Sequence, residues 1–168
     1  MTPTADATRA WVGNLVRSAL WPDAHVRDQA VAAIQDDHPD LPAGETADAW
    51  IAEAHEAWRA DAAEWPEVTD HDRLVRAFRQ LADDGVVVLE GVPDHWSARD
   101  ELRRRTPTPV GVAWFTPTDV WHAIDAGMLE VNLWHGTTAN VAPGDELLDV
   151  ALTAFADAGL EARFDEGR

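Results

Sequence analysis

Residues 69–89 read TDHDRLVRAFRQLADDGVVVL, and this stretch decides how the second half of the chain folds. Thr69 followed by Asp72 is the capping-box pattern of a helix start. Apolar residues then recur at the three-to-four spacing of one helix face, and Gly85 is a natural residue to end that helix. The four apolar residues 86–89 predict a strand that follows directly.

The rest of the second half continues this alternation. Further strands are predicted at 110–115, 128–134 and 160–164, with helices before and after them. We therefore expect an α/β or α+β fold with about four strands in a sheet covered by helices. The 12 residues between the second and third strands only just allow a parallel crossover, which needs about a dozen, so some strands can be antiparallel.

The first half has a different pattern, with about three amphipathic helices and no strand. These helices are predicted near residues 8–20, 22–37 and 45–65, and the loop between the last two holds two prolines and a glycine. We expect residues 1–67 to form an N-terminal helical segment that packs on an α/β domain at 68–168, as one folding unit.

Charge and composition exclude several classes of protein. The 168 residues include 31 acids, 13 arginines, no lysine and no cysteine, which gives a net charge of −18. Without cysteine there is no disulfide, thiolate nucleophile or cysteine-ligated metal. The single basic run, Arg103–Arg105, is too short for nucleic acid or an anionic membrane surface. No signal peptide and no apolar run of ~18 residues is visible, so we expect a cytoplasmic protein.

The acidity itself has two interpretations. Excess Asp and Glu keep a protein dispersed, and in that case the charge has no specific partner. Alternatively, a negative helical face binds a partner protein with a basic surface. A DNA-mimicking inhibitor is the extreme case of such an acidic binding protein. Oligomeric state is left open by the sequence.

The second half also resembles a known family. The helix-to-strand stretch described above, the segment Gly111–Phe115 leading to Asp119, the strand after Gly127 and the final helix before Gly159 are similar to the DUF6891 family of actinobacterial proteins, over roughly residues 68–165. That family has no established activity, so the resemblance implies a fold and no catalytic residues. Many members carry cysteine pairs just after the first strand. Residues 90–96 hold none here, so a cysteine-metal role is lost unless Asp94 and His95 substitute.

A ligand pocket is predicted where the strands end. If the first three strands are parallel, their carboxyl ends meet at one edge of the sheet, where ligands bind in open α/β folds. Polar residues follow each strand there: Asp94, His95, Thr116, His135, Thr137, Thr138 and Asn140. The alternative is that the threonines only cap a helix and that residues 136–140 form a turn.

Metal binding and covalent catalysis have less support. Asp119 and His122 lie three apart on one helix face and His135 could join them, but no tight ligand motif such as H-E-x-x-H occurs. No nucleophile elbow, P-loop or dinucleotide-binding glycine motif is present. We expect no metal and no cofactor.

The nine tryptophans suggest an interface. Several stand at element ends or on the outer side of strands, and Trp96, Trp121 and Trp134 are the interface candidates. The alternative is that they pack against the N-terminal helices. The leading hypothesis is a non-enzymatic protein-binding or regulatory domain with an acidic, tryptophan-bearing surface. The competing one is a small enzyme or ligand- or metal-binding protein with a pocket around His95, His122 and His135.

Overall fold

The computed structural model describes residues 3–165 and has seven helices and three strands in that range. These elements belong to two compact units. The helical unit holds the chain up to Trp65 together with Trp121–Met128, and the sheet unit holds Pro66–Val120 and the chain from Leu129 on. Within residues 3–165, no helix combines the length and the apolar character that crossing a membrane requires.

The helical unit is built from α1 (Ala5–Ser18), α2 (Asp23–Asp37) and α3 (Ala43–Ala62), which pack against one another. One core cluster joins all three helices through four fully buried side chains: Val12, Ala30, Ile34 and Ala47. A second cluster joins Leu15, Val16 and Val26, and Trp121 of α6 (Pro117–Ala126) packs against it. The apolar stripes predicted for these helices therefore face inward.

Three exposed ion pairs connect α3 to the other two helices. Arg9 binds Glu53, the Arg17 guanidinium lies 3.0 Å from the Asp61 carboxylate, and Arg27 Nε lies 2.6 Å from Asp48 Oδ1. Exposed pairs of this kind contribute little to stability.

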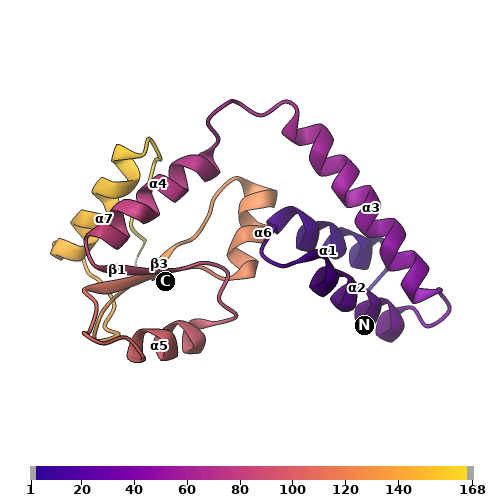
Figure 1. The fold of residues 1–168 in the computed structure, drawn as a ribbon, viewed down its shortest axis with the longest axis horizontal. Coiled ribbons are helices and arrows are strands. Elements are labelled where there is room, and N and C mark those ends of the chain that lie inside the picture. Colours follow the sequence, from indigo (N-terminus) through magenta and orange to yellow (C-terminus); the bar gives the residue numbers. More distant parts are fainter. Residues whose placement is uncertain (1–2, 166–168) are drawn as a thin grey trace. The chain divides into compact units, whose positions relative to one another are not determined.

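The sheet unit is an α+β arrangement with three layers. Its strands β1 (Val86–Leu89), β2 (Gly111–Trp114) and β3 (Asn132–His135) lie in the order β1-β2-β3. Helices α4 (Asp70–Asp83) and α7 (Glu146–Asp157) cover one face of the sheet, and α5 (His95–Arg103) covers the other (Figure 1). Strand β2 is buried along its whole length because it is the central strand.

The prediction of about four strands is wrong in its number. Residues 160–164 are not a strand, although their apolar pattern suggested one. The amide of Leu160 donates back to the Phe155 carbonyl (2.9 Å) and closes the end of α7. Glu161 and Arg163 then pair with each other on the surface.

Strand directions are mixed. β1 and β2 are parallel, with Val86 opposite Gly111, whereas β2 and β3 are antiparallel, with Trp114 opposite Asn132. The chain leaves β2 at Trp114, forms α6 and returns to the same end of the sheet. No crossover is therefore needed, and the short connection is sufficient.

The helix start predicted at Thr69 is present, whereas α1 and α3 begin two to three residues before their predicted starts. The Thr69 hydroxyl oxygen accepts the Asp72 amide (3.2 Å), and an Asp72 carboxylate oxygen accepts the Thr69 amide (2.8 Å), as a capping box requires. Gly85 has a φ of +82°, which ends α4 and turns the chain into β1.

Candidate functional site

The predicted strand-end pocket is divided between two ends of the sheet. Asp94 and Thr116 follow the carboxyl ends of the parallel pair β1 and β2. His135 ends the antiparallel strand β3 and lies opposite Gly111, at the other end of β2. The set of seven residues was predicted on the assumption of three parallel strands, and the antiparallel direction of β3 removes that assumption.

At the β1–β2 end, the polar side chains hold helix starts. Asp94 Oδ1 accepts the Ser97 amide at 2.7 Å and caps α5, and this bond lowers the pKa of Asp94. The carboxylate of Asp119 accepts the amide (2.7 Å) and the hydroxyl (2.8 Å) of Thr116, so both residues belong to the start of α6. The capping interpretation of Thr116 is therefore the one that its contacts support.

At the other end, His135 and Asp145 form the best-defined polar pair of the sheet unit. His135 Nε2 lies 2.9 Å from Asp145 Oδ2, and the same carboxylate oxygen accepts the Ala142 amide at 2.8 Å. These two bonds, the histidine bond first, lower the pKa of Asp145. About a third of each side chain is exposed, so the pair is open to solvent.

The residues between His135 and Asn140 form a tight turn. The Thr138 amide donates to the His135 carbonyl (2.8 Å), Thr138 has a φ of +69°, and Asn140 bridges back to Trp134. A Cβ at Gly136 would lie 2.0 Å from the Pro109 carbonyl oxygen, so the backbones are in close contact there. Thr137 is exposed at the tip. The turn interpretation accounts for these residues, and a ligand-binding loop is not needed.

The metal candidates do not assemble into a centre. His122 is exposed on α6, and Asp119 is engaged in the helix cap. Across residues 3–165, no three His, Asp or Glu side chains form a group that could hold a metal ion.

The three tryptophan candidates differ in exposure. Trp121 packs on the second core cluster of the helical unit, and Trp134 makes an edge-to-face contact with Trp114 at 5.1 Å between ring centroids. Trp96, at the start of α5, is 52% exposed. Of the three, only Trp96 belongs to the exposed residues.

A second exposed tryptophan lies in the helical unit, outside the predicted interface set. Trp65 is 48% exposed and meets Trp58 edge-on, with 5.8 Å between ring centroids. The backbone continues to turn after α3, since the Trp65 amide donates to the Ala62 carbonyl. The spacing of seven residues, two helical turns, is the signal in the sequence that could have identified this pair.

Two carboxylates, Asp61 and Glu64, lie between the two tryptophans in the sequence. Asp61 is bound to Arg17, whereas Glu64 has no ion pair with any residue in 3–165. We call Trp58, Asp61, Glu64 and Trp65 the α3-end surface. It combines an exposed tryptophan with a carboxylate that has no ion pair in the described part of the chain.

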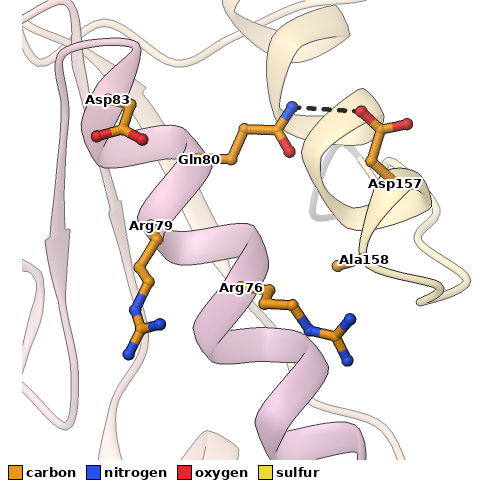
Figure 2. Close-up of a pocket in the computed structure, with 6 residues that line it drawn as sticks. All are labelled: Arg76, Arg79, Gln80, Asp83, Asp157 and Ala158. Carbon is orange, nitrogen blue, oxygen red and sulfur yellow. Dashed lines mark hydrogen bonds between the residues drawn. The ribbon is translucent and has the colours of Figure 1, made fainter.

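A pocket of about 330 Å³ lies between α4 and α7 of the sheet unit. Gln80 Nε2 reaches across it to Asp157 Oδ2 at 3.4 Å. Figure 2 shows that Arg76 extends toward α7 while Arg79 points away from it. The two guanidinium groups therefore do not converge on one ligand, and two carboxylates, Asp83 and Asp157, line the same pocket. The sequence did not indicate this pocket, because its residues form the outer face of an amphipathic helix.

The fold and these surfaces define an α+β protein with a small mixed sheet and a helical unit. The model of a family described as a domain of unknown function, DUF6891, matches residues 2–168. The chain therefore belongs to the DUF6891 family, and the match extends through the helical unit, beyond the residues 68–165 on which the resemblance rested. No curated protein and no solved structure matches the chain.

Proposed function

We propose that this protein is a non-enzymatic, cytoplasmic protein-binding or regulatory domain that uses the α3-end surface to hold a partner with a basic surface. The observation that carries the proposal is the exposed Trp65 ring, which Trp58 supports edge-on. Tryptophan is enriched among the residues that contribute most to protein interfaces, because it offers a large rigid area at a small entropic cost.

The charge of the chain supports the same kind of partner. A net charge of −18 attracts a basic protein at long range and raises its rate of encounter. Glu64, the residue before Trp65 in the sequence, then offers an exposed carboxylate without an ion pair among residues 3–165. Long-range attraction sets the rate, and the contact with Trp65 sets the lifetime of the complex.

The proposal is tested by affinity capture from the source cells with the full chain. We expect a basic protein to co-purify with wild type, to be released by salt, and to be reduced severalfold by Trp65→Ala and by Glu64→Gln. Glu161→Gln is the matched control, because it removes an exposed acid from the sheet unit. Equal recovery with wild type and Trp65→Ala would refute the α3-end surface as the binding site.

A second candidate function is a small enzyme or ligand-binding protein, now centred on His135 instead of on all three histidines. It is favoured by the His135–Asp145 bond of 2.9 Å, because a carboxylate that orients an imidazole is a common arrangement in general-base catalysis. A thermal-shift screen of metabolite mixtures against wild type and His135→Asn separates the candidates. A stabilising compound that loses its effect in His135→Asn would favour the enzyme.

A further inference from the structure

Helix α5 has a face that the fold does not use. Its buried side chains, Ala98 and Leu102, pack on the sheet. Trp96, Arg99 and Arg103 are spaced by three and four residues and therefore form one stripe, about 10 Å long, on a different side of the helix. We call these three residues the α5 stripe.

The tryptophan of the α5 stripe is held in place although it is exposed. The His95 ring lies 4.4 Å from it between centroids, and the Arg99 guanidinium carbon lies 4.3 Å from the Trp96 ring centroid. A guanidinium stacked on an indole keeps its edge N–H groups available for hydrogen bonds. Trp96 and Arg99 are therefore arranged before anything binds to them.

The donors of Arg99 are poorly used within the protein. Its Nε atom is buried without a hydrogen-bond partner, so a carboxylate from outside can reach only the terminal nitrogens. Its closest carboxylate is Asp100, at 3.6 Å from the terminal nitrogen, which is an ion pair without a hydrogen bond. Asp100 follows Arg99 directly in the sequence and lies on the same helix.

Arg103 is available as well. Of the three consecutive arginines at 103–105, Glu101 pairs with the last two, at 3.2 Å to Arg104 and 2.6 Å to Arg105. Arg103 itself has no ion pair with any residue in 3–165. Although the chain has 31 acids, Arg103 is thus without an ion pair among the described residues, two helical turns after the exposed Trp96. At physiological salt, charges farther than about 8 Å are largely screened. The electrostatic interaction of a bound segment is therefore determined by these nearby groups and not by the net charge of the chain.

We propose that the α5 stripe binds an acidic, aromatic-containing segment of a partner protein. Carboxylates of that segment pair with Arg99 and Arg103, and an apolar side chain covers Trp96. Tryptophan and arginine are the residue types most enriched in interface hot spots, and arginine binds carboxylates through two parallel hydrogen bonds. A polyanion such as nucleic acid needs a longer basic stripe to offset the repulsion from a −18 protein, whereas a short segment does not.

The test is selection from a displayed library of short random peptides on the immobilised full chain. We expect two enriched groups on wild type, one basic and one rich in Asp, Glu and aromatic residues. The acidic group should disappear on Trp96→Ala and on Arg103→Gln, while the basic group remains. The basic group reports the α3-end surface, so the failure of one proposal is distinguishable from the failure of the other.

The best acidic peptide is then measured as a free peptide. Arg103→Gln should weaken its binding about tenfold or more. Arg104→Gln is the matched control, because it removes the same charge from the C-cap position directly after Arg103, at a residue already paired with Glu101, and it should change the affinity less than twofold. Circular dichroism establishes that each variant is folded, and Trp96→Phe should retain part of the affinity.

Three outcomes would overturn the proposal. The first is that no acidic peptide is enriched. The second is that Arg104→Gln weakens binding as much as Arg103→Gln, which would indicate a diffuse electrostatic effect. The third is sedimentation that shows self-association abolished by Arg103→Gln in the absence of peptide, which would assign the α5 stripe to a second copy of this chain.

Discussion

At the scale of single residues, several acids have a local structural task. Asp72 and Asp94 accept backbone amides at helix starts, and Asp145 accepts the Ala142 amide and faces His135. Hydrogen bonds to the charged form lower the pKa of all three carboxyls. A carboxyl group whose pKa is lower in the folded than in the unfolded state stabilises the fold while it is ionised.

The His135–Asp145 bond makes stability depend on pH in a defined direction. Because the hydrogen bond from His135 holds the pKa of Asp145 below its ordinary value, the contribution of Asp145 to stability is present above the unfolded pKa and is lost as the pH falls through the folded pKa. We expect Asp145→Asn to lower the melting temperature at neutral pH, and the difference from wild type to vanish in acid. Melting curves between pH 7 and pH ~2 measure this difference.

Asp149→Asn is the control for that series, since it removes a charge from the same first turn of α7 without removing the bond to His135. A difference between wild type and Asp145→Asn that stays constant down to the lowest pH would show that the bond, and not the ionised carboxylate, stabilises this end of the sheet.

At the scale of elements, helix starts could be predicted because the capping hydrogen bonds that define them join residues close together in the sequence. We expect Thr69→Ala to destabilise the protein by about 1 kcal/mol, because the first turn of α4 loses its hydroxyl acceptor. Thr153→Ala, at an exposed position inside α7, should leave stability unchanged or raise it slightly. Urea denaturation compares the two. An equal loss in both variants would mean that the cap does not contribute.

Strand number and direction could not be predicted in the same way. Residues 160–164 have the local pattern of a strand, but a strand also needs a neighbour to pair with, and the pattern says nothing of that neighbour. The direction of β3 depends on where the chain re-enters the sheet after α6, which is a tertiary property. Local sequence therefore predicted the α+β class and most helix starts, but not the three-stranded sheet.

The candidate site depended on the same missing information. His135 and Asn140 were grouped with Asp94 only because three parallel strands were assumed, and one reversed strand separates them. The His135–Asp145 pair was missed because the two residues are ten apart and meet through the turn of a loop. The exposure of Trp65 could not be predicted, because it depends on how the chain leaves α3.

At the scale of the whole molecule, the net charge of −18 opposes folding through self-repulsion. We expect the melting temperature to rise by roughly 3–6 °C between ~10 mM and ~500 mM NaCl, which corresponds to about 1–2 kcal/mol for a chain of this size. Differential scanning fluorimetry measures the shift, with sorbitol as a non-ionic control. A falling melting temperature would mean that the ion pairs between α3 and its neighbours outweigh the repulsion.

The position of Trp121 has a consequence for biosynthesis. This residue packs on the cluster formed by Leu15, Val16 and Val26, yet it is translated long after α3. At about 5–20 residues per second, the nascent helices wait on the order of several seconds before Trp121 is made. During that interval their apolar patch is uncovered on the ribosome. Completion of the helical unit is thus timed by elongation, and slow codons before residue 121 would lengthen its exposure to chaperones and to aggregation.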